Sequence, residues 1–267
     1  MKNVYLFFGF IATLLMYHSC SVAKTINLNP GQLKVLTYNI HHANPPSNPG
    51  LIDLPAIVKV IKESKADIVG LQEIDVHTER SGKNLDQAAE LGRLTGMHHY
   101  FVKGIDYQGG EYGVAILSRF PIIKYESLRL PMQEGIGGEP RVLAVITVEP
   151  VKGKKIVFAN THMDLKPETR ILQARAIVDY LKDIQSPVIF CGDLNAKPGS
   201  DPIKLFDEFF TRSSIPNGFT IPQINPKSEI DFIMFKPANR FKILKHGVIN
   251  EPYASDHLPV LVELELK

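Results

Sequence analysis

The stretch Pro187-Val188-Ile189-Phe190-Cys191-Gly192-Asp193-Leu194-Asn195-Ala196-Lys197-Pro198 combines an apolar run with a carboxylate and a carboxamide. A short apolar run between Pro and Gly is typical of a strand buried on both faces, so we predict a strand over 188–191. On an extended backbone, Asp193 and Asn195 would point the same way. Such a pair can bind a hard cation, a water or a phosphate. An Asx turn after a core strand explains the same residues, so other segments must decide.

Composition indicates one large globular domain. The chain has 267 residues, of which 44% are hydrophobic and 22% charged, and its formal net charge is +2. This length can bury a substantial core. The near-neutral charge gives no strong preference for polyanions, although a local basic groove is compatible with it.

The N-terminus has the features of an export signal. Lys2 precedes a mostly apolar run from Val4 to Met16, which is short for a membrane span and suits a signal peptide. Two processing events fit: cleavage before Cys20, giving a lipoprotein anchored through this cysteine, or cleavage after Ala23. We therefore predict a signal peptide over 1–23 and a single catalytic domain over 24–267, located in the periplasm, on the outer membrane or in the medium. Removal of Lys2 lowers the formal net charge to +1.

The remaining chain alternates apolar strands with amphipathic helices, which predicts one α/β domain. Cys191 would be a buried strand residue without a disulfide partner. The predicted helices cover 54–65, 86–95 and 168–184. The predicted strands cover 33–40, 67–73, 98–102, 113–117, 141–148, 155–159, 188–191, 229–235, 242–249 and 258–264.

Polar residues gather at or near the predicted strand ends, each flanked by apolar residues. Burying such a group without a partner costs about 1–3 kcal/mol, and more for a charge. Each residue alone has a structural explanation, such as a turn cap, a surface ion pair or a core histidine, but their recurrence favours one shared site. The residues are Asn39, Glu73, His162, Asp193, Asn195, Asp231, Asp256 and His257.

Most of these residues stand in short motifs that follow one another along the chain. The motifs are Thr37-Tyr38-Asn39-Ile40, Leu71-Gln72-Glu73, Leu117-Ser118-Arg119, Asn160-Thr161-His162, Gly192-Asp193-Leu194-Asn195-Ala196, Ile230-Asp231-Phe232-Ile233 and Ser255-Asp256-His257-Leu258-Pro259. In this order they resemble the motifs of the endonuclease/exonuclease/phosphatase superfamily, which is deoxyribonuclease I-like. The likeness spans residues 33–262. It implies a four-layer α/β/β/α sandwich of two packed mixed β-sheets, with the site at one edge.

The resemblance also implies a metal site and a hydrolytic mechanism. Glu73 would be the main Mg²⁺ ligand, with Mn²⁺ as a substitute, and Asn39 and Asp256 would contribute directly or through water. Asp231 would orient His257 and raise its basicity.

The other catalytic residues would act on the phosphate and the water. Asp193 and Asn195 would position the attacking water and a phosphate oxygen, and His162 would donate to a phosphoryl oxygen. Arg141 suits a bidentate phosphate contact, and suits a surface strand equally well. His41 and His42 would line the pocket, with no catalytic role expected.

The expected partner is a phosphoester substrate, and the expected state is a monomer. Specificity would reside in four segments, 43–53, 103–112, 131–140 and 211–228, which lack the mixture of basic and aromatic residues expected of a DNA-tracking surface. The first hypothesis is therefore an exported Mg²⁺-dependent phosphodiesterase or phosphatase acting on a small or lipid-linked substrate. The second is a secreted endonuclease, and the third a catalytically inactive binding domain.

Overall fold

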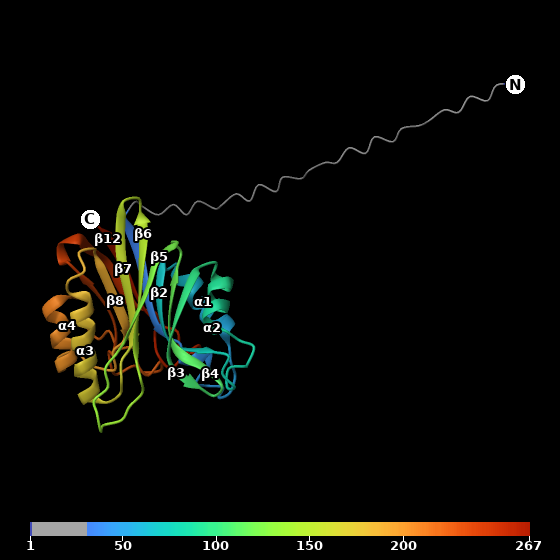
Figure 1. The fold of residues 1–267 in the computed structure, drawn as a ribbon, viewed down its shortest axis with the longest axis horizontal. Helices are drawn as coiled ribbons and strands as arrows, with labels where there is room; N and C mark the ends of the chain where they lie inside the picture. The colour runs from blue at the N-terminus through green and yellow to red at the C-terminus, as the bar shows by residue number, and fades with distance from the viewer. Residues whose placement is uncertain (2–30) are drawn as a thin grey trace.

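Residues 31–267 form two mixed sheets of six strands each (Figure 1). A computed structural model describes residue 1 and residues 31–267, so the predicted signal peptide and Cys20 lie outside the residues that can be discussed. Sheet A has the order β11(Phe241–Val248), β12(Val260–Leu266), β1(Gln32–Asn39), β2(Ile68–Val76), β4(Gly110–Ser118) and β3(His98–Tyr107). Sheet B has the order β5(Ile122–Arg129), β6(Val142–Val151), β7(Lys154–His162), β8(Val188–Asp193), β10(Asp231–Lys236) and β9(Thr211–Ser213).

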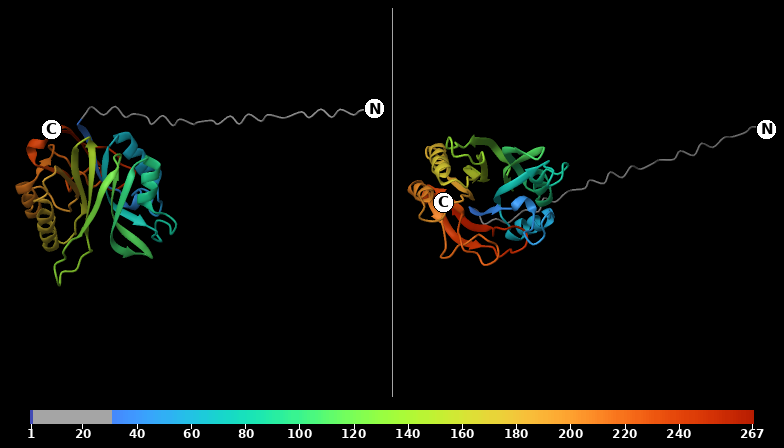
Figure 2. Two further views of the ribbon diagram at one scale, coloured as in Figure 1. Left: turned by 45° about the horizontal axis from the view of Figure 1, so that its top comes forward. Right: turned by 90° about the horizontal axis from the view of Figure 1, so that it is seen from below.

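Three hydrophobic layers hold the sheets and helices together. The first lies between the two sheets, with Val35 and Ile68 of sheet A in one cluster with Phe158 and Ile189 of sheet B. The second joins sheet A to α1(Leu54–Ser64) and α2(Gln87–Thr95). The third joins sheet B to α3(Pro167–Leu181) and α4(Asp201–Phe209), so the helices cover the outer faces (Figures 1 and 2). The predicted four-layer sandwich is confirmed.

The centre of each sheet is a parallel strand pair joined by a helix. β1 pairs with β2 across α1, and β7 pairs with β8 across α3. The side chain of Asp53 caps α1 by accepting from the amide of Ala56, and the helix ends at Lys65 in a left-handed conformation. Both strands of a parallel pair end on the same side of their sheet. Because the two sheets pack against each other, residues at the ends of β1, β7 and β8 can meet.

Several predicted boundaries were wrong, and three elements were missed. The segment 103–112 is not a loop, because it forms most of the hairpin between β3 and β4. β2 does not end at Glu73 but continues to Val76 past a bulge. The missed elements are β5, a mostly exposed strand at a sheet edge, and α4 and β9, which lie in the Pro-rich stretch after β8.

A buried polar bridge joins the two sheets below the site. The Gln72 amide donates to Asn160 Oδ1 at 2.6 Å and to Thr37 Oγ1 at 3.1 Å. Asn160 in turn donates to the carbonyls of Leu71 and Ala115, both at 2.9 Å. A Cβ atom at Gly70 would collide with the Cys191 thiol and with Asn160, so glycine is needed for this close approach. Cys191 itself is buried between the sheets, as predicted.

Within the described part of the chain, no helix is both long and apolar enough to cross a membrane.

Candidate active site

Strand register brings three of the predicted site residues together at the ends of neighbouring strands of sheet B. His162 is paired with Asp193 across the parallel β7–β8 ladder, and Asp231 is paired with Asp193 across the antiparallel β8–β10 ladder. Residues opposite each other on neighbouring strands place their side chains on the same face. Nε2 of His162 accordingly lies 3.4 Å from Oδ2 of Asp193.

The loop before β12 adds His257 to this group. Its Nδ1 lies 2.9 Å from Oδ2 of Asp231, and its Nε2 lies 3.7 Å from Oδ2 of Asp193, so the imidazole stands between two buried carboxylates. The Thr220 hydroxyl also donates to Asp231 Oδ2, at 2.5 Å. The Ser255 hydroxyl donates to the backbone oxygen of Asn39 at 2.7 Å, which fixes the loop against the end of β1. The Asp231–His257 contact agrees with the pairing that the sequence motifs imply.

The charges in this group shift the pKa values of its members in opposite directions. Burial favours the neutral imidazole of His257, but the carboxylates of Asp231 and Asp193 outweigh burial and raise its pKa to about 10. Burial and the adjacent Asp231 raise the pKa of Asp193 well above its usual value, because two buried carboxylates repel each other. Burial and the nearby Arg141 lower the pKa of His162, which is therefore neutral.

Asn39 links this group to the carboxylate on sheet A. Its Nδ2 donates to Glu73 Oε1 at 3.0 Å and to Asp193 Oδ2 at 3.1 Å, while its Oδ1 accepts from the backbone N–H of His41 at 3.0 Å. A carboxamide binds a metal through its oxygen, and this oxygen is directed to a backbone amide. The contacts therefore make Asn39 a bridge between two carboxylates, and its oxygen is directed away from Glu73.

Glu73 reaches the site through an irregularity in β2. The pairing of β2 with β4 shifts between Leu71 and Ile74, and Glu73 has a φ of 60°. A bulge of this kind redirects a side chain and is common next to active sites. Burial opposes ionisation of Glu73, but the His42 imidazole, at 3.9 Å, and the Asn39 amide favour the charged form and hold its pKa well below the usual range.

Two histidines stand beside Glu73 on strained backbone. His41, His42 and Ala43 form the single-turn helix η1(His41–Ala43) and all have positive φ, of 47°, 44° and 60°. Each such non-glycine residue costs on the order of 1–3 kcal/mol and is found mainly at functional sites. One ligand atom from each of His41, His42 and Glu73 lies within 4.8 Å of the others. The adjacent histidines were visible in the sequence, but the turn that aims both at Glu73 was not.

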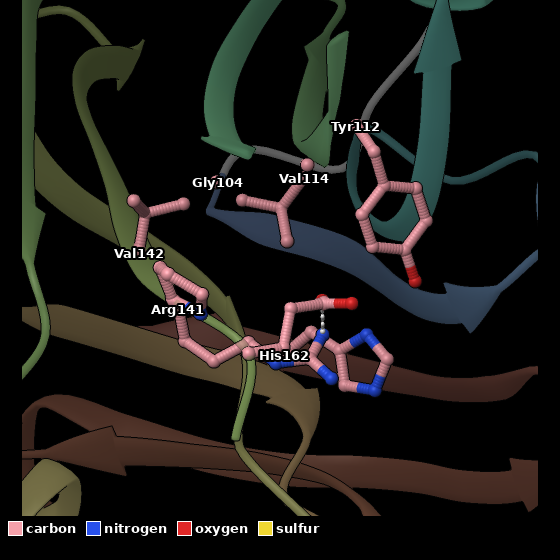
Figure 3. Close-up of a pocket in the computed structure, with 9 residues that line it drawn as sticks. Gly104, Tyr112, Val114, Arg141, Val142 and His162 are labelled. Carbon is pink, nitrogen blue, oxygen red and sulfur yellow. Dashed lines mark ion pairs between the residues drawn. The ribbon is translucent and has the colours of Figure 1, made fainter. Parts of the chain in front are cut away.

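Arg141 lies inside the site and not on an exposed surface, so the reading as a surface strand residue was wrong. Its side chain is buried and pairs with Glu139 Oε1 at 2.9 Å. Its Nε is also buried and has no hydrogen-bond partner within residues 31–267. A small pocket at this position is lined by Arg141, Tyr112 and His162 (Figure 3). A buried guanidinium with an unused donor is suited to an anionic group of a substrate.

Two predicted site residues lie differently from what was expected. Asn195 has a φ of 48°, so the backbone after Asp193 is not extended and the two side chains do not simply point the same way. Its amide donates to the carbonyl of Met163 at 2.9 Å, while its backbone N–H binds Asp193 Oδ1 at 2.9 Å, so Asn195 braces Asp193. Asp256 is half-buried and is not a member of the group of potential ligands that the described residues form around Glu73.

The residues around Glu73 fit a divalent cation. A carboxylate supplies negative charge, and Nδ1 of His42 is buried without a hydrogen-bond partner in the described chain. A buried polar atom without a partner is costly, so a ligand that uses its lone pair would relieve that cost. The second compact group, Asp193, Asp231 and His257, already uses Asp231 to hold His257 and is better suited to proton transfer.

Comparison with known proteins agrees with this architecture. A model of the Endonuclease/Exonuclease/phosphatase family matches residues 36–257. The uncharacterized protein YbhP of Escherichia coli strain K12 is 30% identical over 247 residues, which cover 87% of this chain and 96% of YbhP.

Solved structures share the fold. A family protein from Bacteroides thetaiotaomicron has a TM-score of 0.74 at 23% identity and covers 90% of this chain and 100% of its own. The mannosyl-6-phosphatase of that organism has a TM-score of 0.72 at 22% identity, covering 87% and 99%.

Proposed function

The chain belongs to the endonuclease/exonuclease/phosphatase family, whose members are hydrolases acting on phosphoesters, and we propose that it is a metal-dependent hydrolase of a small phosphoester. The observation that carries this proposal is the continuous contact path across the two sheets. It runs from Glu73 through Asn39 to Asp193 in steps of 3.0 and 3.1 Å, and on to His257 at 3.7 Å. A potential metal ligand and a buried carboxylate–imidazole group therefore face one another, which is the arrangement that hydrolysis by an activated water requires.

Asp193 is the residue best placed to accept a proton from the attacking water. It is buried, it receives hydrogen bonds from Asn39 and Asn195, and it stands beside two imidazoles. His257, held between Asp193 and Asp231, carries the positive charge that stabilises negative charge on the phosphoryl group. Asp231 does raise the basicity of His257, but the resulting imidazolium between two carboxylates is a poor base for activating the water.

His162 and Arg141 supply further contacts to the phosphoryl oxygens. The neutral imidazole of His162 can donate one N–H, and Arg141 offers its unpaired Nε. Both groups line the same pocket, so they would orient the phosphorus atom for attack opposite its leaving group.

The sequence motifs imply Mg²⁺, and a divalent cation here would be held by Glu73 with the imidazoles of η1 beside it. Such an ion would supply positive charge that offsets negative charge on the phosphate.

The walls of the site favour a small substrate. The pocket at Arg141 shares Tyr112 and Glu139 with a second pocket that is also lined by Arg80 and Tyr107. The Arg80 guanidinium lies 4.6 Å from the ring centroid of Tyr107 and 5.4 Å from that of Tyr112. Two small adjoining pockets with arginine and tyrosine in their walls suit a phosphate and one attached group. A structural neighbour named as a mannosyl-6-phosphatase supports the same substrate class.

We also propose that the protein acts outside the cytoplasm, because its first 23 residues have the pattern of an export signal. Mass spectrometry of the mature N-terminus would identify cleavage after Ala23 or an acylated Cys20. An intact Met1 on protein recovered from the cytoplasm would overturn this assignment.

The test of the proposed activity is turnover of bis-nitrophenyl phosphate and of a panel of sugar phosphates, lipid phosphoesters and supercoiled plasmid, with and without Mg²⁺. We expect metal-dependent hydrolysis that favours small or lipid-linked phosphoesters and depends weakly on NaCl. Rapid plasmid nicking that falls steeply with salt, without turnover of the panel, would identify a nuclease instead. Full turnover after exhaustive chelation would contradict metal dependence.

A further inference from the structure

The donor atoms beside Glu73 are not those of a typical magnesium site. Mg²⁺ is bound by oxygen atoms and retains several waters, whereas imidazole nitrogens favour first-row transition metals. Here two imidazoles and one carboxylate place ligand atoms within 4.8 Å of one another. We propose that His41, His42 and Glu73 form a site selective for a transition-metal dication, such as Co²⁺ or Zn²⁺, over Mg²⁺. The selectivity of the site stands by itself; only the assignment of this ion to hydrolysis rests on the proposed function.

The hydrogen bond of His41 leaves its other ring nitrogen free to bind a metal. Nδ1 of His41 lies 2.9 Å from the backbone oxygen of Asn44. A carbonyl oxygen can only accept, so Nδ1 carries the proton and Nε2 retains its lone pair. Metal-binding histidines usually donate their other N–H to a carbonyl or carboxylate in this way, which fixes the tautomer and the orientation of the ring.

His42 presents a buried nitrogen to the same carboxylate. Its Nδ1 lies 3.9 Å from Glu73 Oε2, which is too long for a hydrogen bond, and has no other partner within the described residues. The side chains of His42 and Glu73 are only 13% and 21% exposed, so water competes weakly for this nitrogen.

The backbone holds both rings in place although its conformation is unfavourable. The N–H of His41 is bound by Asn39 Oδ1 at 3.0 Å, and the carbonyl of His42 accepts from the Gln87 side chain at 2.7 Å. The N–H of Ala43 donates to the carbonyl of Ile40 at 2.8 Å. Hydrogen bonds from three directions therefore maintain three consecutive residues with positive φ. A turn that only connects β1 to α1 would not require histidine at these positions.

Metal binding can be measured without substrate. Chelated, dialysed protein would be titrated with MgCl₂ and with CoCl₂ by calorimetry, and Co²⁺ binding followed by its visible absorption, which responds to nitrogen ligands. We expect one Co²⁺ per chain, bound on the order of 100-fold or more tightly than Mg²⁺. Equal affinities for the two ions in the unaltered protein would overturn the proposal.

The decisive variant is His41→Asn combined with His42→Asn. Asparagine tolerates positive φ better than most residues and offers oxygen in place of nitrogen, so the turn is expected to persist while the preference for Co²⁺ falls to a few-fold. His98→Asn is the matched control, because His98 is exposed on β3, and it should keep the unaltered preference. If the double variant fails to show native circular dichroism, the single variant His42→Asn replaces it. An unchanged Co²⁺ preference in a folded variant would also overturn the proposal.

Turnover separates this inference from the proposed function. Hydrolysis supported fully by Mg²⁺ in a protein without Co²⁺ preference would refute only the metal selectivity. Histidine-dependent Co²⁺ binding without hydrolysis of any phosphoester would uphold the site and refute the proposed function.

Discussion

The two sides of the site are built in opposite ways. On the sheet B side, His162, Asp193 and Asp231 occupy consecutive positions across a regular ladder. On the sheet A side, the potential metal donors all lie on residues with positive φ. Ordinary strand register places the groups proposed to transfer protons, whereas a strained turn and a bulge place the proposed metal ligands. A regular ladder fixes the distances between side chains on paired strands. An irregular backbone can direct a side chain to a position that a strand residue does not reach.

The largest effect should come from Asp193→Asn, which tests the regular side. Asparagine preserves the size of the side chain but cannot accept the proton of the attacking water. We expect kcat to fall by on the order of 10³-fold, measured with bis-nitrophenyl phosphate.

Asp67→Asn is the matched control for this substitution. Asp67 is a buried carboxylate that precedes β2 and binds the backbone N–H of Lys34. This variant should retain most of its activity. A loss in Asp193→Asn no larger than in the control would remove Asp193 from its assigned role.

The next effect concerns His257, whose charge depends on Asp231. Catalysis needs ionised Asp193 and protonated His257, so kcat/KM should rise with pH through the raised pKa of Asp193 and fall near pH 10. Asp231→Asn should reduce kcat by on the order of 10²-fold and move the alkaline limb toward 6.5, the ordinary value for histidine. An activity that instead increases up to pH 10 would make His257 the base.

The same pKa shift predicts how stability depends on pH. The pKa of His257 is higher in the folded protein than in the unfolded chain, so the folded state binds this proton more tightly. The stabilisation is complete below about pH 6.5 and is lost as pH increases through about 10. Urea unfolding of the unaltered protein and of His257→Asn between these pH values would measure the contribution. The difference between the two proteins should shrink as pH increases.

A smaller effect tests the polar bridge that holds the two sides in register. Asn160→Leu removes the hydrogen bonds of this side chain to Gln72, Leu71 and Ala115, and leaves the amide of Gln72 and two carbonyls short of partners. We expect a loss of about 2 kcal/mol in the free energy of unfolding. Thr161→Val on the same strand removes only one bond, to the carbonyl of Val142, and should cost about 1 kcal/mol. Equal losses would mean that the bridge adds nothing beyond a single bond.

The sequence predicts the regular side better than the irregular one. Three segments have the apolar pattern and the flanking residues of a strand: the run before Asp193, Asn160-Thr161-His162 and the segment that contains Asp231. Pairing of these strands then brings their site residues together. Family resemblance supplied the arrangement in four layers, which no local pattern contains. The helix over 201–209 was nevertheless recognisable, since Ser200 precedes it and Ile203 and Phe206 recur at helical spacing.

The irregular side could not be predicted because it contradicts local preferences. Histidine, alanine and glutamate all disfavour positive φ, so His41, Ala43 and Glu73 would be assigned to ordinary strand or helical backbone. Their conformation is imposed by distant partners such as Asn39 and Gln87, which come into contact only in the folded protein. The sequence therefore pointed to Asn39 and Asp256 as companions of Glu73 and gave no sign that His41 and His42 stand beside it.

The smallest effect separates backbone strain from chemistry at these positions. Lys65 has a φ of 55° at the exposed end of α1, and His42 has a φ of 44° at the site. Glycine adopts both conformations without a steric penalty, so Lys65→Gly and His42→Gly should each raise the free energy of unfolding by up to about 1 kcal/mol. Thermal and urea unfolding of the metal-free protein would measure this gain. Only His42→Gly should also weaken Co²⁺ binding, because it alone removes a proposed ligand.

If His42→Gly instead destabilised the metal-free protein while Lys65→Gly stabilised it, the imidazole of His42 would be contributing to the fold through packing. The contrast between a regular side and a strained side would then fail, because His42 would add to the free energy of unfolding and would not lower it.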